Sequence, residues 1–180
     1  MAIDDPTTAL RLRAATADDV PTVLRLIRGL AEYERLLDEC VATEAQLRET
    51  LFGAQPQAEV VIAEWNGEAA GFALFFHNYS TFLARRGLYL EDLFVFPEHR
   101  GRGIGRALLS HLARVALARG CGRFEWAVLD WNAPAIGFYR ALGAVAMDEW
   151  TVMRVTGDAL ERLAAENGKA ENETAEDGRA

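Results

Sequence analysis

The sequence predicts an α/β (α+β) protein in which helices flank both faces of a central mixed sheet. Three observations lead to this prediction. Two capping-box starts in the first fifty residues are each followed by a helix-compatible segment. Asn66-Gly67 joins two apolar runs, as in a tight β-hairpin. Further along, strand-like and helix-like patterns alternate, so the expected element order is β-α-α-β-β-β-α-β-α-β.

The N-terminal segment is expected to hold one strand and two helices. The alternating segment LRLRAA, residues 10–15, predicts a short strand. A Thr-x-x-Asp capping box then starts a helix over residues 16–34, and a Thr-x-x-Gln box starts a shorter helix over residues 43–52. The first helix has apolar side chains at helical spacing: Val20, Val23, Leu24, Ile27, Leu30 and Ala31.

The middle of the chain is expected to supply three strands. The apolar runs 58–65 and 68–76 form the predicted hairpin. The polar segment HNYSTFLARR, residues 77–86, is interpreted as a loop. The segment GLYLEDLFVF, residues 87–96, predicts a further strand, which Pro97 stops.

The remaining pattern alternates between helix and strand. A helix is expected from Ile104 to near Gly120, followed by a strand over 123–129 and a helix over 134–143. The segment AVAMDEWTVMRV, residues 144–155, is interpreted as a final strand or a broken hairpin.

The domain is expected to be a single unit over residues 8–165. A possible last helix covers 158–165, and the tail 166–180 contains no large apolar residue. Such a tail cannot offset the entropy of ordering, so the termini 1–7 and 166–180 are expected to be disordered.

Composition narrows the possible partners. Hydrophobic residues make up 51% of the chain, charged residues 26%, and the formal net charge is -8. This balance predicts a soluble protein without a nucleic-acid or membrane partner, and it favours a small cationic ligand. The N-terminus MAIDDPTTAL does not resemble a signal sequence, and no apolar run approaches the roughly 20 residues of a membrane span. We therefore expect a cytoplasmic protein.

Cysteine and histidine spacings indicate neither a disulfide framework nor a metal site. Cys40 and Cys121 form no CxxC pair and are expected to be reduced. His77, His99 and His111 share no metal-ligand spacing with one another or with the cysteines. No metal cofactor is therefore expected.

The segment EHRGRGIGRALL, residues 98–109, places three glycines and three arginines where a strand gives way to a helix. Free N–H groups at a helix N-terminus, approachable because glycine lacks a Cβ, form an anion site and favour a pyrophosphate. A Walker loop is excluded because Gly105 is followed by Arg106-Ala107, and a dinucleotide fingerprint lacks its third glycine at Leu108. A glycine-rich turn with solvated arginines is the structural alternative.

The pattern Arg100-x-x-Gly103-x-Gly105 resembles the acetyl-CoA loop of the GCN5-related N-acetyltransferases (GNAT superfamily). The segments 15–34, 88–105 and 127–144 are similar to the diamine acetyltransferases, and VLDWN with GDALERLA is closer to the thialysine N-epsilon-acetyltransferase branch. The resemblance implies a GNAT fold with a mostly antiparallel, twisted sheet of six to seven strands. It also implies acetyl-CoA as co-substrate, a small-molecule amine as acceptor, and a homodimer.

Residue roles follow from the same resemblance. It implies that Glu91 accepts the amine proton, directly or through a water, and that Tyr139 protonates the departing thiolate. The implied acceptor-binding residues are Tyr33, Glu34, Glu91, Glu125, Trp126 and Ala127. The implied cofactor-binding residues are Leu93, Phe94, Val95, Arg100, Gly101, Arg102, Gly103, Ile104, Gly105, Arg106, Asn132, Pro134, Ala135 and Tyr139.

Local patterns leave alternatives for the two catalytic candidates. Strict alternation would place Asp92 on the same face as Leu88, Leu90 and Phe94, with Glu91 on the opposite face, so only one acid could serve a given site directly. Both acids could instead cap backbone groups or pair with arginine. Tyr139 lies seven residues after Asn132, on the same helix face, where core packing is the alternative role.

The expected function is transfer of acetyl from acetyl-CoA to a primary amine of a small molecule by direct attack in a ternary complex. Thialysine-like amino acids and di- or polyamines are the leading acceptors, and Arg85 or Arg86 could bind an amino-acid carboxylate. Acetylation of a protein, peptide or antibiotic amine remains open. A non-catalytic CoA-binding sensor also remains open, although it would need neither Glu91 nor Tyr139.

Overall fold

The computed structural model describes residues 9–176, which belong to two compact units divided between Leu129 and Asp130. The larger unit contains a sheet and three helices, and the smaller unit contains two helices. Each unit is described by itself.

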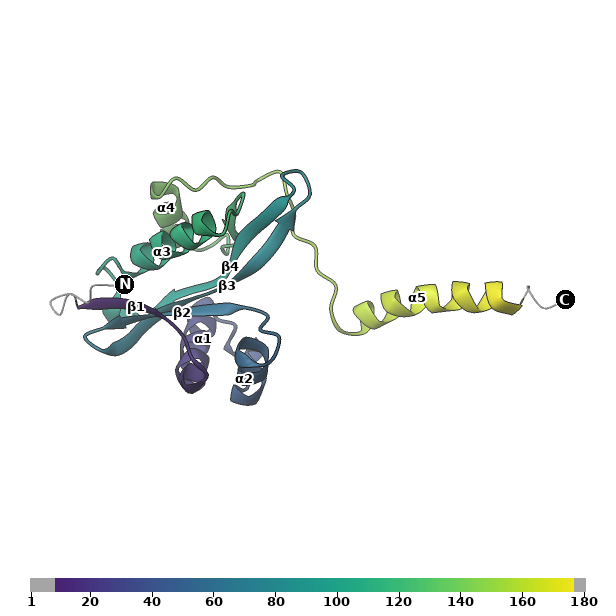
Figure 1. Cartoon of the computed structure of the whole chain (residues 1–180), viewed down its shortest axis with the longest axis horizontal. Coiled ribbons are helices and arrows are strands. Elements are labelled where there is room, and N and C mark those ends of the chain that lie inside the picture. The colour runs from purple at the N-terminus through teal and green to yellow at the C-terminus, as the bar shows by residue number, and fades with distance from the viewer. Residues whose placement is uncertain (1–8, 177–180) are drawn as a thin grey trace. The chain divides into compact units, whose positions relative to one another are not determined.

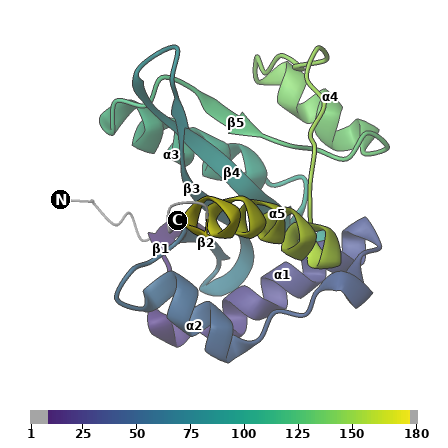
Figure 2. The ribbon, with the colours of Figure 1, turned by 90° about the vertical axis from the view of Figure 1, so that its right-hand side faces the viewer.

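The sheet of the larger unit has five strands in the spatial order β1-β2-β3-β4-β5 (Figure 1). Neighbours are antiparallel from β1 to β4, and β5 runs parallel to β4 (Figure 2). The strands are β1 Leu10–Ala14, β2 Glu59–Trp65, β3 Glu68–Ser80, β4 Arg85–Val95 and β5 Phe124–Trp126. The predicted mixed, mostly antiparallel sheet is confirmed, with five strands in place of six to seven.

Helices cover both faces of this sheet, as predicted. Figure 1 shows α1 and α2 on one face and α3 on the other. The helices are α1 Val20–Glu34, α2 Glu44–Phe52 and α3 Ile104–Ala118. Short 3-10 turns lie at Ala17–Asp19, Leu37–Glu39 and Pro97–His99. Both predicted capping boxes are present, one before the 3-10 turn that leads into α1 and one before α2.

The core under α1 and α2 fixes which side of the central strands faces these helices. Phe72 of β3 and Phe94 of β4 are buried in this core, and Leu74 packs against it. Phe72 pairs with Phe94, and directly opposed residues of an antiparallel ladder point to the same face. This face is called the α1 face below.

The segment 77–86, interpreted from the sequence as a loop, is mostly strand. His77 pairs with Leu88, Tyr79 with Arg86 and Ser80 with Arg85, so β3 and β4 continue as a long antiparallel ribbon. Only residues 81–84 turn. The loop prediction is wrong here because ladder hydrogen bonds to a neighbouring strand stabilise an extended conformation even where the side chains are polar.

The strand β4 contains a one-residue bulge at Glu91. Leu74 pairs with Asp92, but the next residue of β3, Phe75, pairs with Leu90. The extra residue shifts the alternation, so Asp92 lies on the α1 face with Phe94 while Leu88 and Leu90 lie on the opposite face. The predicted common face for these four residues is therefore wrong.

The smaller unit contains α4 Ala133–Ala141 and α5 Gly157–Glu176. Within its described residues, 130–176, the expected strand over 144–155 is not formed, and several of its large apolar side chains are exposed: Val145, Met147, Trp150, Val152 and Met153. A strand requires a paired neighbour, and this segment has no such neighbour in the sheet.

The last helix is longer than the sequence predicts. It begins at Gly157 and continues to Glu176, through residues for which disorder is expected. Alanine and glutamate are frequent in this stretch and have high intrinsic helix propensity. Residues 1–8 and 177–180 lie outside the described residues.

Candidate active site

The strands β4 and β5 are paired over only three residues. Leu88, Tyr89 and Leu90 oppose Phe124, Glu125 and Trp126, and the pairing ends there. Strand β4 continues to Val95, so the edge of residues 91–95 that would face β5 forms no ladder hydrogen bonds with β5. Its main-chain groups can therefore bind an extended ligand that takes the place of a neighbouring strand. Leu93, Phe94 and Val95, all predicted cofactor residues, lie in this segment.

Carboxylates gather where the open segment begins. Glu91, at the bulge, is exposed, and Asp92 is half-buried. Burial first, and then the charges of Glu91 and of Glu34 at the end of α1, together raise the pKa of Asp92 to about 6. Burial also raises the pKa of Glu34. Three acids in one region favour a cation, as the prediction for Glu34 and Glu91 requires.

Arg100 connects this region with the glycine loop. Its guanidinium carbon lies 4.6 Å from the ring centroid of Tyr33 and 5.8 Å from that of Phe94. Its Nε donates a hydrogen bond to the carbonyl oxygen of Val95, with an N···O distance of 3.0 Å. Arg100 is thus held against the predicted acceptor residue Tyr33, and it orients that ring through a cation–π contact.

The glycine loop has the backbone conformation that the anion-site prediction requires. Gly101 and Gly103 have positive φ angles of 75° and 78°. Gly103 is the N-cap of α3 and provides no side-chain cap. The first-turn N–H groups, including those of Ile104 and Gly105, have no intrahelical acceptors, so they can bind phosphate oxygens.

The arginines of the loop lie at its surface. Arg102 has its guanidinium carbon 5.0 Å from the ring centroid of Trp65, and its Nη2 donates to the carbonyl oxygen of Glu98 at 3.3 Å. Arg106, in the first turn of α3, is exposed. Exposed cations add a screened attraction for an anion and leave the geometry of binding to the backbone.

The predicted acceptor residues of β5 differ from one another. The carboxylate of Glu125 accepts a hydrogen bond from Asn78 Nδ2 at 2.8 Å and forms an ion pair with Arg123 Nε at 2.7 Å. Its charge is therefore already balanced. Trp126 packs edge-on against Phe124 with a centroid distance of 5.0 Å, and Ala127 is exposed just beyond the last paired residue.

In the smaller unit, the predicted residues Asn132 and Tyr139 occupy the two ends of α4. The side chain of Asn132 is buried and caps the helix, with its Oδ1 accepting a hydrogen bond from the Ala135 N–H at 3.3 Å. Pro134 lies in the first turn, which suits a residue without an N–H donor. The Tyr139 ring is 5.4 Å from that of Phe138. The predicted helical spacing of seven residues is confirmed.

Sequence reasoning missed two features of the site. It did not select Asp92 as an acid facing α1, because the bulge that turns it there depends on pairing with β3. It also missed that Arg123 forms an ion pair with Glu125 and that Asn78 donates a hydrogen bond to the same carboxylate. The only available signal for the second feature was the Arg-x-Glu spacing on β5, which predicts side chains on one face.

The open strand edge runs from a group of carboxylates to a cationic glycine loop, an arrangement that suits an anionic ligand beside a cationic one. The chain belongs to the acetyltransferase (GNAT) family, whose model matches residues 27–144. It is an acetyl-CoA-dependent N-acetyltransferase.

Curated relatives match most of the chain. It is 42% identical over 164 residues to a thialysine N-epsilon-acetyltransferase of Bos taurus, covering 85% of this chain and 96% of that protein. It is 35% identical over 198 residues to an L-ornithine N5-acetyltransferase of Arabidopsis thaliana, covering 85% and 87% of the two chains.

Solved structures share the fold. An integron cassette protein of V. cholerae has a TM-score of 0.75 and 26% identity, with 87% of this chain and 98% of that chain covered. An aminoglycoside acetyltransferase from an uncultured soil sample has a TM-score of 0.72 and 18% identity, with 86% and 100% covered. At this identity, the second likeness concerns the fold alone.

Between residues 9 and 176, no helix combines the length and apolarity needed to cross a membrane. In the same part of the chain, no group of three or more His, Cys, Asp or Glu side chains is arranged to hold a metal ion.

Proposed function

We propose that the acceptor is the side-chain amine of a small diamino acid, such as thialysine or ornithine, with di- and polyamines as further candidates. The observation that carries this proposal is the group of carboxylates, Glu34, Glu91 and Asp92, beside the open edge of β4. The names of the relatives, which describe thialysine and ornithine acetyltransferases, support it. Arg85 or Arg86, at the start of β4, is proposed to bind the acceptor carboxylate.

In the proposed donor site, the loop and the open strand hold different parts of acetyl-CoA. The N–H groups from Gly101 to Arg106 bind the pyrophosphate, and the open edge of residues 93–95 binds the pantetheine arm. Asn132, Pro134 and Ala135, at the start of α4, contact the same arm. Glu125, Trp126 and Ala127 line the acceptor side through backbone and ring contacts, because the Glu125 carboxylate is already paired.

The proposed reaction has one bond exchange. The neutral amine nitrogen attacks the thioester carbonyl carbon, a C–N bond forms, and the C–S bond breaks. An alkylammonium has a pKa near ~10.4, so keeping it neutral at pH 7 costs about 4–5 kcal/mol. Glu91 receives the ammonium proton, directly or through a water, before the attack. The Tyr139 hydroxyl gives a proton to the leaving thiolate, and the second proton, lost by the nitrogen as the amide forms, restores that hydroxyl through solvent.

The substitution Tyr139→Phe tests this proposal. It removes the proton donor but keeps the ring, so turnover should fall by roughly 10²–10⁴-fold while CoA binding persists. Tyr79→Phe is the control for loss of a tyrosine hydroxyl, because Tyr79 is exposed. Since Tyr79 pairs with Arg86, turnover is compared at saturating acceptor. Unchanged turnover in Tyr139→Phe would remove this hydroxyl from the mechanism.

A panel of acceptors tests the substrate class. Thiol release from acetyl-CoA is measured with thialysine, lysine, ornithine, putrescine, spermidine and a short peptide. The proposal expects the highest kcat/KM for a diamino acid. A preference for the peptide would favour a protein substrate, and silence across the panel with CoA still bound would favour a sensor.

We further propose a homodimer and a single catalytic domain over residues 8–165. The exposed apolar side chains of the segment 144–155 support association, because such patches mark interaction surfaces. Light scattering should then give about twice the 19.9 kDa of one chain. Deletion of residues 166–180 should leave kcat/KM unchanged.

The proposed location is the cytoplasm. The proposed co-substrate is acetyl-CoA, and the reaction is proposed to require no metal. Cys40 and Cys121 are both free thiols, which suits a reducing compartment. No nucleic-acid or membrane partner is proposed. Cell fractionation tests the location, and activity after chelation tests the absence of a metal requirement.

A further inference from the structure

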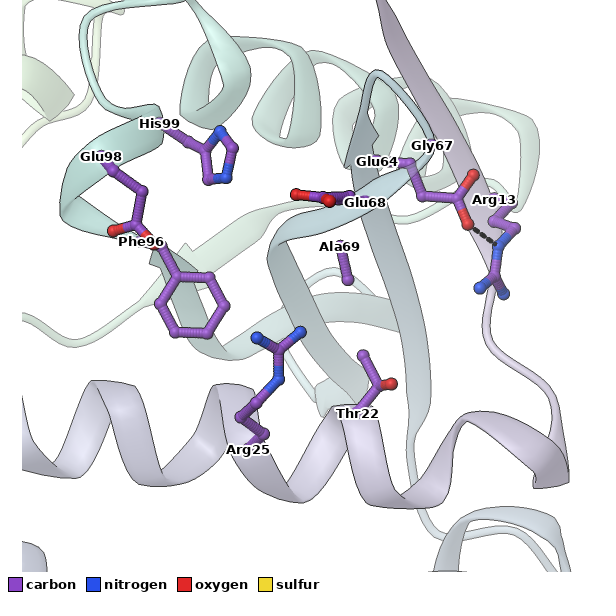
Figure 3. Close-up of a pocket in the computed structure, with 10 residues that line it drawn as sticks. All are labelled: Arg13, Thr22, Arg25, Glu64, Gly67, Glu68, Ala69, Phe96, Glu98 and His99. Atoms are coloured by element: carbon purple, nitrogen blue, oxygen red, sulfur yellow. Dashed lines mark hydrogen bonds and ion pairs between the residues drawn. The ribbon is translucent and has the colours of Figure 1, made fainter.

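A polar cavity of about 490 Å³ lies at the end of the sheet where β2 turns into β3 (Figure 3). Its walls come from β1, α1, the β2–β3 turn and the segment 96–99 that follows β4. Figure 3 shows Arg25, Glu68 and His99 reaching into one space from three of these elements. The volume is in the range of small-molecule sites, roughly 300–1,000 Å³.

One wall of this cavity is fixed by ion pairs. Arg13 forms ion pairs with Asp19 at 2.7 Å and with Glu64 at 2.6 Å, and Glu64 also lies 3.6 Å from Arg11. The hydrogen bonds to Arg13 lower the pKa of Asp19 well below its usual range. These groups satisfy one another, so they shape the cavity rather than attract a charged ligand.

The opposite side of the cavity carries charges that are not paired with each other. Arg25 stacks on Phe96, with its guanidinium carbon 5.0 Å from the ring centroid, and within residues 9–176 it forms no ion pair shorter than 4.0 Å. The same holds for Glu68 and Glu98 in that part of the chain.

His99 adds a second kind of unsatisfied group. Its Nδ1 atom is buried and has no hydrogen-bond partner among the described residues. Because this atom is closed off from solvent, it costs free energy in the wall of the cavity and is not itself a contact for a ligand there. The cavity thus offers one cation, Arg25, and two anions, Glu68 and Glu98, to whatever occupies it, with the His99 ring as part of its wall.

We propose that this cavity binds an α-amino acid in its zwitterionic form, with the carboxylate at Arg25 and the ammonium between Glu68 and Glu98. A phosphate or other polyanion would meet the two carboxylates, and a diamine would leave the guanidinium unpaired. Only a ligand with both charges matches both sides. The Thr22 hydroxyl, one helical turn before Arg25, can donate to the ligand carboxylate.

This site is separate from the proposed acceptor site. None of the residues that line it is Glu34, Glu91 or Asp92, and its ligand class follows from its own charges. The inference therefore does not rest on the proposed function. Glu98 and His99 directly precede Arg100 and Gly101, so an occupied cavity would adjoin the glycine loop.

The test is an NMR titration of the full ¹⁵N-labelled chain, without acetyl-CoA, using L-alanine as probe. Saturable shifts are expected at the amides of Gly67, Glu68 and His99. L-alanine methyl ester lacks the carboxylate charge and N-acetyl-L-alanine lacks the ammonium, so each should bind about tenfold more weakly.

Protein variants check the same contacts from the other side. Arg25→Gln and Glu68→Gln should each weaken L-alanine about tenfold. The matched control is Arg28→Gln, an equal charge change at an exposed position of α1 that does not line the cavity. Each of three results would overturn the proposal: no saturable shift near His99, equal affinity in Arg25→Gln and wild type, or shifts confined to Glu91 and Asp92.

Discussion

The two ends of the open segment of β4 differ in charge and in the atoms that would contact a ligand. At its start, side-chain carboxylates gather around the Glu91 bulge, and burial raises the pKa of Asp92. At its end, the loop from Gly101 to Gly105 presents backbone N–H groups at a helix N-terminus. The acid end can thus be altered by side-chain substitution, whereas the glycine end is altered chiefly through backbone conformation.

This difference explains how one short segment can serve two ligands of opposite charge. Only a few residues separate Glu91 from Arg100, and Arg100 bonds to the Val95 carbonyl while it stacks on Tyr33. The guanidinium therefore lies between the two ends and limits the repulsion between carboxylates and an approaching anionic donor.

The largest expected effect is at the acid end. Glu91→Gln keeps the shape of the side chain but removes the proton acceptor, so kcat for the amine should fall by roughly 10²–10⁴-fold. The affinity for acetyl-CoA, measured by calorimetry, should be unchanged. Glu32→Gln, at an exposed position of α1, is the matched control. An equal decrease of kcat in Glu91→Gln and Glu32→Gln would show that the net charge of the protein, and not a proton acceptor at Glu91, determines kcat.

A smaller effect concerns the pH dependence of stability. Asp92 has a pKa raised from 3.8 to about 6, so the folded state holds its proton more tightly than the unfolded state. The free energy of unfolding should therefore fall as pH rises from about 4 to 6, by up to about 3 kcal/mol from this group.

Asp92→Asn should abolish this decrease. Denaturant unfolding at pH 4 and pH 8 measures it, and the variant should gain stability relative to wild type at pH 8 but not at pH 4. The pKa of Asp19 is lowered, so protonation of Asp19 reduces stability at low pH. This effect is the same in wild type and in Asp92→Asn. If the stability of wild type and Asp92→Asn changed with pH in the same way, the pKa of Asp92 would not be raised in the folded protein.

The next effect is at the glycine end. Gly103→Ala adds a Cβ at a φ of 78°, which costs roughly 1–2 kcal/mol for a residue with a side chain. The loop should relax, and the KM for acetyl-CoA should rise about tenfold. Gly120→Ala is the matched control because Gly120 also has a positive φ, 67°, and open space around it.

Both glycine variants should lose similar stability, but only Gly103→Ala should change the KM for acetyl-CoA. A KM for acetyl-CoA that stays at the wild-type value in Gly103→Ala would contradict the role of the loop backbone. Equal increases would mean that a general loss of stability accounts for the change.

Local signals in the sequence predicted the glycine end and several other turns and helix starts. The capping boxes, the Asn66-Gly67 turn and the start of α3 are encoded within a few neighbouring residues, and all are present. Positive φ angles at Gly101 and Gly103 follow from the same kind of local signal.

The acid end could not be predicted in the same way. Which face Asp92 occupies depends on the register of β4 against Leu74 and Phe75, and nothing within β4 marks the bulge. The polar segment 77–86 forms strand for the same reason, because its conformation is set by pairing with the neighbouring strand. Non-local pairing, rather than residue type, decided both outcomes.

The smallest expected effect comes from the arginines of the loop. Arg102→Gln removes an exposed charge that stacks on Trp65, and exposed charges contribute only about 0.2–1 kcal/mol. The affinity for acetyl-CoA should therefore fall roughly 2–5-fold at low salt and less at high salt. Arg28→Gln, which is remote from the loop in sequence and lies on α1, controls for net charge. If Arg102→Gln lost much more affinity for acetyl-CoA than Gly103→Ala, side-chain charge rather than the backbone N–H groups would bind the anion. The two ends of the open segment of β4 would then differ in charge alone.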